Sequence, residues 1–164
     1  MKPNLLSLTA FLLILAGIVT SCKDKVTDEP EITYPIDIPF EEYSEGASCQ
    51  LFVPSSTVPN DALIMIHSNE ELEKYIKCWD GTYPAIDFSK YTLILGGGNT
   101  LKYRVTSIQT CLQQISSKNY RLNVEVNLEL TISTEFKFWA ISILVDKTVD
   151  VSNIELNLIK IKNM

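Results

Sequence analysis

Bulky apolar residues stand at every second position from Tyr120 to Leu130, and Arg, Asn and Glu fill the positions between them. Successive side chains of a β-strand point to opposite faces of its sheet. The alternation therefore predicts a strand with one buried face and one face in water.

Weaker patterns predict further strands on both sides of this one. Residues 91–95 and 138–145 are almost continuously apolar, which is typical of buried strands, and we expect 138–145 to be central. Ile159 and Ile161 break the alternation of the last strand, which predicts a β-bulge there. The other candidate strands are 50–53, 62–66, 103–114 and 154–158.

One helix is predicted over residues 69–79. Ser68 and Glu71 form a capping box, in which the Ser68 hydroxyl accepts from the backbone N–H of Glu71 while the Glu71 side chain reaches back. Gly81 follows as a helix stop. The apolar positions at helical spacing are Leu72, Tyr75, Ile76 and Trp79. We expect Leu72 and Ile76 to pack against a sheet.

These elements predict an α+β fold, mainly an antiparallel curved β-sheet or incomplete barrel with one packed helix. Gly96–Asn99 follows a buried strand but has no Lys-Ser/Thr ending and no helix after it, so it does not resemble a phosphate-binding loop. We interpret it as a turn that needs positive φ angles.

The first residues resemble an export signal. Lys2 precedes an apolar run over 5–19, and the run ends at Val19-Thr20-Ser21-Cys22. This junction resembles a lipobox, so we predict a signal peptide over 1–21 and a lipid on Cys22. The alternative is an ordinary signal peptide or anchor that happens to end in cysteine. The lipid would anchor the protein in the cell envelope, at the outer membrane, through its N-terminus.

Residues 22–48 differ in composition from the rest. They hold three prolines and eight carboxylates against two lysines, which favours an extended acidic tether. Two outcomes stay open for 34–40: it belongs to the tether, or it docks on the domain as an edge strand, where proline is tolerated. We expect a single domain over 49–164.

Composition excludes several classes of function. The chain has 164 residues and a net charge of −6, which argues against nucleic-acid binding. His67 is its only histidine, so most His-based catalytic and metal sites are excluded. We therefore expect no metal and no cofactor.

Three cysteines follow Cys22, and an exported protein meets an oxidising compartment. One disulfide is expected, with three possible pairings of Cys49, Cys78 and Cys111. We favour Cys49–Cys78, because both residues lie at the ends of predicted elements, and we expect Cys111 to be a small buried thiol.

Other residues with potential chemistry fit structural roles better. Cys78 sits at the wrong end of its predicted helix to form a thiol nucleophile pair with His67. Glu125 and Glu129 are ~13 Å apart at strand spacing, too far for a glycosidase pair. A sugar platform of exposed aromatic residues is an alternative to burial in the core for Tyr75, Tyr83, Trp79 and Tyr91.

Residues 84–96, Pro-Ala-Ile-Asp-Phe-Ser-Lys followed by a buried strand, resemble a segment of small Bacteroides-type lipoproteins. The segment is also similar to the C-terminal domain of the spirochaete protease-complex accessory lipoprotein. The shared features span roughly 60–160 and include the Ser68–Leu72 helix start and the Trp139–Lys147 strand. We expect Asp87 and Ser89 to hydrogen-bond the backbone at the strand entry, and Phe88 to fill the gap between helix and sheet.

The resemblance implies a role without catalysis, in which the lipoprotein binds or stabilises a protease. We therefore predict a lipid-anchored binding or accessory module with a protein partner, and no enzymatic activity. The alternative is a surface lipoprotein that binds glycans through exposed aromatic residues.

Overall fold

The computed structural model describes residues 32–44, 48–51, 60–83, 85–131 and 137–163. Its compact unit extends from Thr33 to Met164. The predicted signal peptide and Cys22 lie outside the described residues. None of the helices in the described ranges is long and apolar enough to cross a bilayer.

The described strands form two four-stranded sheets and one two-stranded ladder, and all neighbours are antiparallel except β8 and β10. The first sheet has the order β1 (Ile36–Ile38), β7 (Tyr103–Gln114), β8 (Tyr120–Leu130), β10 (Ile154–Asn163). The second sheet has the order β2 (Glu41–Glu42), β9 (Lys137–Asp146), β6 (Tyr91–Leu101), β4 (Ala62–Ile66). The ladder joins β3 (Cys49–Leu51) to β5 (Ile76–Cys78). The helix α1 spans Asn69–Tyr75, and a short 3-10 helix spans Val151–Asn153.

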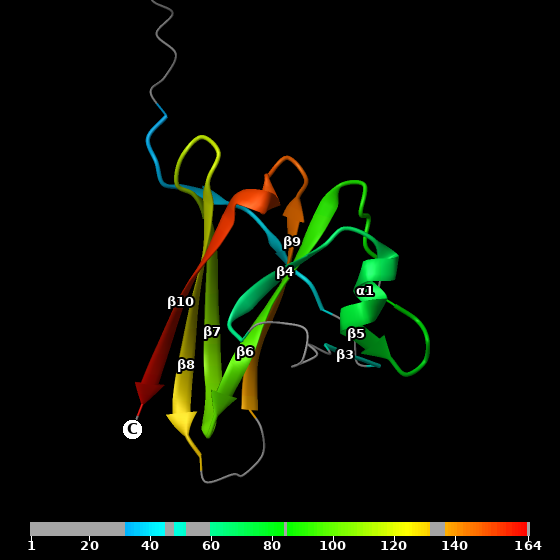
Figure 1. The fold of residues 1–164 in the computed structure, drawn as a ribbon, viewed down its shortest axis with the longest axis vertical. Coiled ribbons are helices and arrows are strands. Elements are labelled where there is room, and N and C mark those ends of the chain that lie inside the picture. Colours follow the sequence, from blue (N-terminus) through cyan, green and yellow to red (C-terminus); the bar gives the residue numbers. More distant parts are fainter. Residues whose placement is uncertain (1–31, 45–47, 52–59, 84, 132–136, 164) are drawn as a thin grey trace, which may run out of the picture. The chain divides into compact units, whose positions relative to one another are not determined.

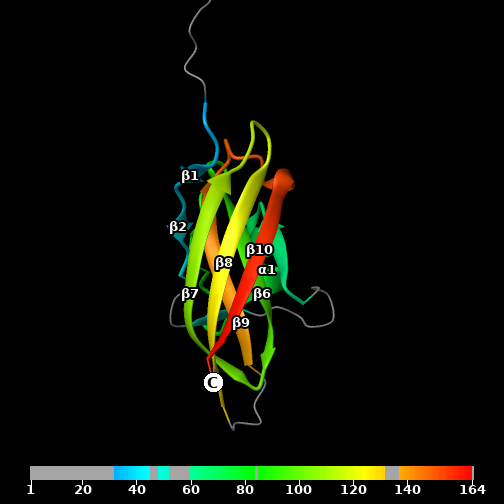
Figure 2. The same ribbon diagram turned by 90° about the vertical axis from the view of Figure 1, so that its left-hand side faces the viewer.

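The two sheets stack face to face, and α1 covers the outer side of the second sheet (Figures 1 and 2). The core between the sheets joins the inward residues of β8, Leu122 to Leu128, to Trp139 and Ile143 of β9. The predicted alternation of β8 is confirmed from Tyr120 to Leu128, where inward positions are buried and outward positions are not, but Leu130, at the end of the strand, is exposed. The mainly antiparallel α+β class is thus observed, whereas a single curved sheet or incomplete barrel is not confirmed.

A second core lies between the second sheet and α1. Leu72 and Ile76 are fully buried there against Leu93 and Leu95, as expected. Ile94 points the other way, into the core between the sheets. Because β6 is covered on both faces, its sequence is continuously apolar instead of alternating.

The folded unit begins earlier than the sequence predicted. Residues 36–38 form the edge strand β1 beside β7, which is the docked outcome left open for this segment. Glu41 and Glu42 pair with β9, and Tyr43 is buried. The predicted boundary at Cys49 is therefore wrong, because acidic composition does not prevent a segment from pairing along the edge of a sheet.

The helix is shorter than the predicted 69–79. It ends at Tyr75, and Ile76 turns to extended angles of φ −117° and ψ 133° to begin β5. Cys78, at the end of β5, forms a disulfide with Cys49 of the paired strand β3. This bond holds β5 in the two-stranded ladder. Trp79, expected on the apolar face, is 73% exposed.

The capping box is present in a modified form. The backbone N–H of Glu71 donates to Ser68 Oγ at 3.2 Å, as predicted. The Glu71 carboxylate accepts from the backbone N–H of His67 at 2.7 Å, one residue before the usual partner.

The Gly96–Asn99 segment is not a turn. It continues β6, and Gly96 pairs with Ile141 on one side and Leu63 on the other. A Cβ on Gly96 would lie 2.9 Å from the Ile141 side chain. Gly96 and Gly98 are therefore needed for close packing and not for positive φ angles, which among the described glycines occur only at Gly81.

The predicted bulge near Ile159 is also wrong. Strand β10 keeps one continuous register with β8 from Ile154 to Asn163. The pattern changes because Lys160, opposite the buried Val126, occupies an inward position usually given to an apolar residue.

Candidate functional site

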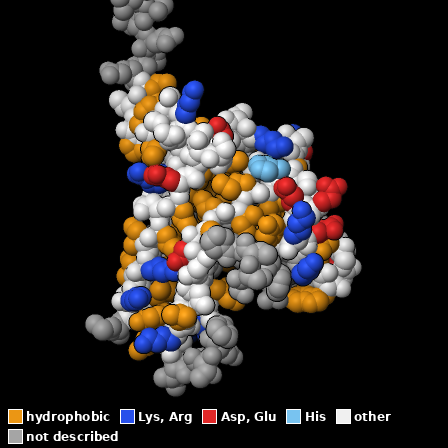
Figure 3. Space-filling model, in the orientation of Figure 1, with side chains coloured by type: hydrophobic (Ala, Val, Ile, Leu, Met, Phe, Trp, Pro, Cys, Tyr) orange, Lys and Arg blue, Asp and Glu red, His pale blue; other side chains and the backbone are white. Residues whose placement is uncertain are grey.

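Large hydrophobic side chains are exposed at the end of the unit where β6 turns into β7. Leu101 is 66% exposed, Phe138 60% and Leu130 53%. Figure 3 shows hydrophobic and basic side chains side by side at the lower end of the unit, where β8 and β10 finish. We call this surface the distal tip; it consists of Leu101, Lys102, Tyr103, Leu130, Phe138 and Lys162.

The strand registers place these residues at one end. Leu101 pairs with Lys137, the neighbour of Phe138, and Tyr103 pairs with Leu130. The ammonium group of Lys162 lies 5.1 Å from the centre of the Tyr103 ring. Strand ends of both sheets thus contribute residues to the distal tip.

The backbone of Leu101 is unusual. Its φ is +55°, in the left-handed region that L-residues other than Asn and Asp seldom adopt. Its backbone N–H donates to the side-chain oxygen of Asn99 at 2.6 Å, and Thr100 Oγ1 donates to the carbonyl of Tyr103 at 2.7 Å. The neighbouring polar residues therefore hold the connection in a shape that aims an apolar side chain into solvent.

Two cations lie beside this apolar group. Lys102 lies 5.8 Å and Lys162 5.1 Å from the Tyr103 ring centre, within the range of cation–π attraction. Neither lysine forms an ion pair within the described residues. The nearby Arg104 pairs with Glu129. The described residues of the distal tip thus carry two positive charges, in a chain whose net charge is negative.

The chain enters the folded unit at the opposite end. Strand β1 runs beside the end of β7 that contains Gln114, whereas Tyr103 begins β7 at the distal tip. At the usual strand rise, the two ends of β7 are about 35 Å apart.

A polar cluster closes the sandwich behind the distal tip. Asp61 accepts from the indole N–H of Trp139 at 2.8 Å and from Lys160 Nζ at 2.7 and 2.8 Å. Lys160 also donates to the carbonyl of Asn99 at 3.3 Å. The cluster joins β10 of the first sheet to β6 and β9 of the second, and every charged group in it has a partner.

The single histidine borders a shallow pocket of about 350 Å³. His67 Nδ1 lies 3.4 Å from Thr92 Oγ1. Lys147 and Asp150 line the same pocket. Thr92 and Thr148 supply the hydroxyl groups of the pocket lining, which holds no cysteine in the part of the chain that the structure describes.

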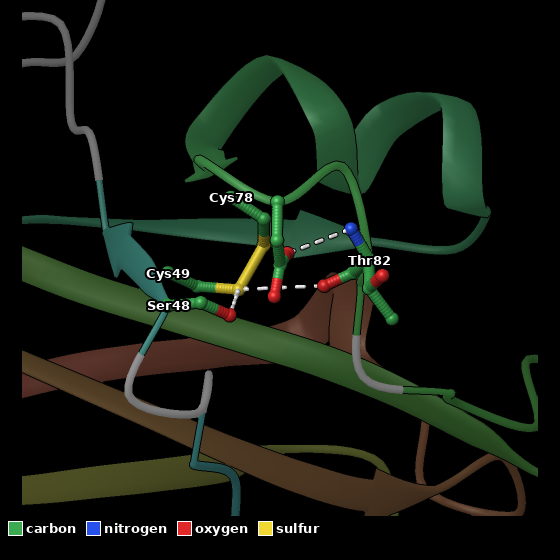
Figure 4. The surroundings of a disulfide bond; sticks show 5 residues. Ser48, Cys49, Cys78 and Thr82 are labelled. Atoms are coloured by element: carbon green, nitrogen blue, oxygen red, sulfur yellow. Dashed lines mark hydrogen bonds between the residues drawn. A yellow bond between two sulfur atoms is a disulfide. The ribbon is translucent and has the colours of Figure 1, made fainter.

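Cys49 and Cys78 form a disulfide, which is the pairing that the sequence favoured (Figure 4). The two residues stand opposite each other in the β3–β5 ladder, beside α1. Cys49 Sγ also lies 3.7 Å from the carbonyl oxygen of Thr82. Closing a loop of this length stabilises the fold by about 3 kcal/mol through the unfolded chain.

Cys111 is the free thiol of the described residues, but it is not buried in the core as expected. It lies on the outer face of β7, 3.7 Å from Asp37 of β1. Partial desolvation, with Asp37 as a second cause, raises the pKa of this thiol.

The other candidates from the sequence are not brought together. Glu125 hydrogen-bonds Asn127, and Glu129 pairs with Arg104, so both glutamates are held separately on the outer face of β8. Of the proposed aromatic platform, Tyr75 and Tyr83 pack against the core beneath α1, and Trp79 is exposed.

Four aspartates close turns by the same geometry. In each case a Ser or Thr two residues later donates its backbone N–H to the carboxylate, as Ser89 does to Asp87 at 3.1 Å. The pKa of the carboxyl group is held below its usual value in all four, mainly by the serine hydroxyl in Asp87 and Asp150 and by the backbone N–H of the threonine in Asp80 and Asp146. The predicted bonding role of Asp87 is confirmed, but the carboxylate is exposed, and Phe88 packs against the core as expected.

Sequence reasoning missed the distal tip. The exposure of Leu101, Leu130 and Phe138 depends on where strands end, and no single-residue pattern marks those ends. Lys102 precedes Tyr103 in the sequence, but Lys162 could be assigned to Tyr103 only after β10 had been placed beside β8. Within the described ranges, no cluster of His, Cys, Asp and Glu could hold a metal ion.

Comparison with known proteins gives no match to a family model, a curated protein or a solved structure.

Proposed function

We propose that this protein is a lipid-anchored binding or accessory module of the cell envelope, at the outer membrane, with a protein partner. Cys22 is the proposed attachment site for the lipid. The resemblance of 84–96 to protease accessory lipoproteins makes a protease the partner we favour. In this role the protein catalyses no reaction and needs no cofactor.

The distal tip is the observation that supports a binding role best. Isolated exposed hydrophobic residues are ordinary on protein surfaces, but a contiguous group marks an interaction site. Leu101, Leu130 and Phe138 are exposed at one end of the strands, near Lys102 and Lys162, which have no ion-pair partner among the described residues. That end lies opposite the point where the chain from the proposed lipid would enter the fold.

Cross-linking in native membranes tests the proposal. Cells that produce the full-length protein are treated with formaldehyde, and the protein is recovered with an antibody. We expect one envelope protein to be recovered in proportion to the bait, and to be lost in the Cys22→Ala variant. Recovery no higher than with an unrelated lipoprotein at equal abundance would count against a protein partner.

Glycan binding is the alternative, and the exposed indole of Trp79 is the observation that favours it. Exposed indoles stack on sugar rings. A glycan array probed with the wild-type protein and with Trp79→Ala would decide: binding that is lost in the variant supports the alternative. No binding by the wild type leaves the protein-partner proposal in place.

A further inference from the structure

We propose that the distal tip binds an extended acidic segment of a partner protein, with Leu101 as the apolar anchor and Lys102 and Lys162 as the anionic contacts. This inference rests on the proposed function and adds to it the chemistry of the partner.

The backbone conformation and the exposure of Leu101 indicate a role in binding. A left-handed backbone is unfavourable for leucine and is readily adopted by glycine or asparagine. The side chain gains little burial in return, since 66% of it is exposed. A residue that neither suits its backbone nor packs in the core does not serve folding, and an exposed apolar side chain on a hairpin connection is suited to insert into a partner.

The two lysines of the distal tip indicate the charge of the partner. Lys102 and Lys162 flank the Tyr103 ring and have no carboxylate partner among the described residues. Arg104, next in the chain, is already neutralised by Glu129. The distal tip therefore attracts carboxylates, and a segment with Asp or Glu beside an apolar residue complements it in both charge and polarity.

The direction of the fold favours a protein segment over a membrane. Lysines around exposed Leu and Phe side chains would also suit anionic lipids. The chain, however, enters the unit near Gln114, and the distal tip lies at the other end of β7. The chain from the proposed lipid on Cys22 thus joins the folded unit at the end of β7 that is remote from the distal tip.

The free edge of β10 is a weaker candidate for the same partner. It has no neighbour among the described strands, and exposed edges can pair with an added strand. Lys160, however, points inward from this strand to Asp61. Inward-pointing charges are a device that proteins use to block edge pairing. The distal tip has no such protection.

Selection from a peptide library tests the inference. The mature chain with Cys22→Ala, which is not lipidated, is used to select from a phage-displayed library of random dodecapeptides. We expect enriched peptides with Asp or Glu next to a bulky apolar residue. Their affinity should fall about tenfold in Lys102→Glu and in Lys162→Glu, and should weaken as salt is raised. Leu101→Asn should weaken binding similarly, because asparagine keeps the left-handed backbone and removes the apolar contact.

Matched controls separate the distal tip from general effects of charge. Lys118→Glu makes the same charge change on an exposed residue in the hairpin at the other end of β7, and Trp79→Asn removes another exposed apolar side chain. Both should bind the selected peptides like the wild type. Enriched peptides without acidic residues, no enrichment, or equal losses in the controls would overturn the inference.

A vesicle arm tests the membrane alternative. The same unlipidated chain is mixed with vesicles of phosphatidylglycerol and phosphatidylcholine. Sedimentation with the vesicles that depends on Leu101 would reassign the distal tip to lipid. If the cross-linked envelope partner is recovered equally by Leu101→Asn, the proposed function stands and the distal tip is not its site.

Discussion

Lys160 and Asp61 form an ion pair that connects the edge of the first sheet to the residue just before β4 of the second, with Nζ 2.7 and 2.8 Å from the two carboxylate oxygens. Their side chains are only 22% and 31% exposed. Asp61 also satisfies the indole N–H of Trp139, a side chain that is almost completely buried.

Asp61→Ala should therefore reduce the free energy of unfolding by about 2–3 kcal/mol, because it leaves a buried indole N–H and a half-buried ammonium group without their acceptor. Asp61→Asn is the matched control: it suits the left-handed φ of +62° and can still accept from Trp139. Urea unfolding of both variants measures the difference. Equal stabilities of Asp61→Ala and the wild type would show that the cluster contributes nothing.

Gly98 lies against this cluster. A Cβ at this position would lie 2.0 Å from Asp61 Oδ1 and 2.7 Å from Trp139 Nε1. Gly98→Ala should cost about 1–3 kcal/mol, because the ion pair or the indole must move. Gly81→Ala provides the comparison, since it meets only the strain of a φ of +72° in open space. Its cost should be about 1 kcal/mol. Thermal or urea melts that place Gly98→Ala above Gly81→Ala in stability would contradict the packing argument.

Acid should destabilise the fold through its turns. The carboxyl pKa values of Asp80, Asp87, Asp146 and Asp150 are lowered by hydrogen bonds from Ser or Thr. A pKa that is lower in the folded state than in the unfolded chain gives stability that is present above the unfolded value, near 4. This stability is lost as the pH falls through the folded pKa.

The melting temperature should accordingly fall between about pH 4 and pH 2. Asp150→Asn should show a smaller fall, because it removes one of the titrating groups while keeping an acceptor for Ser152. Glu70→Gln is the control, because this exposed residue in the first turn of α1 is not one of the four carboxylates that close turns. The melting temperature of this variant should depend on pH as that of the wild type does. Parallel pH profiles for the wild type and Asp150→Asn would refute the assignment.

The thiols give a chemical test of the disulfide. The Cys22→Ala variant, unfolded without reductant, should react with one equivalent of a thiol reagent, at Cys111. In the folded protein this reaction should be slow near pH 8, because the raised pKa of Cys111 leaves little thiolate. Asp37→Asn should speed it by removing the nearby negative charge. Peptide mapping that finds three reactive thiols would contradict the Cys49–Cys78 bond.

Lipidation at Cys22 is tested by labelling with a fatty-acid analogue. Cys22→Ala should lose the label and move to the soluble periplasmic fraction, because the thiol that carries the lipid is gone. Cys111→Ala, which changes a cysteine distant in sequence, should keep the label. Equal labelling of the wild type and Cys22→Ala would exclude a lipid at this cysteine.

Local periodicity was sufficient to predict elements whose apolar and polar positions follow a regular pattern along the chain. The alternation of 120–130 and the capping box at Ser68 were both read from the chain alone. The errors arose where a partner distant in sequence determined the outcome. Residues Ile76–Cys78 form a strand instead of the end of the helix because they pair with the strand that contains Cys49. Gly96 and Gly98 lie within a strand, where the absence of a side chain leaves room for Ile141 and Trp139. The distal tip could not be predicted for the same reason, since Lys162 and Tyr103 meet only when β10 lies beside β8.

The order in which the strands occur along the chain also constrains assembly during synthesis. Strand β8 is synthesised well before β10, and the intervening β9 belongs to the other sheet. Until β10 has been synthesised, the inward row of β8 from Leu122 to Leu128 has an open edge beside it, and the Lys160 ammonium group that pairs with Asp61 is missing. A chain that stalls before β10 therefore exposes an apolar, aggregation-prone strand to chaperones and proteases. Arrival of Lys160 would mark the point at which this exposure ends.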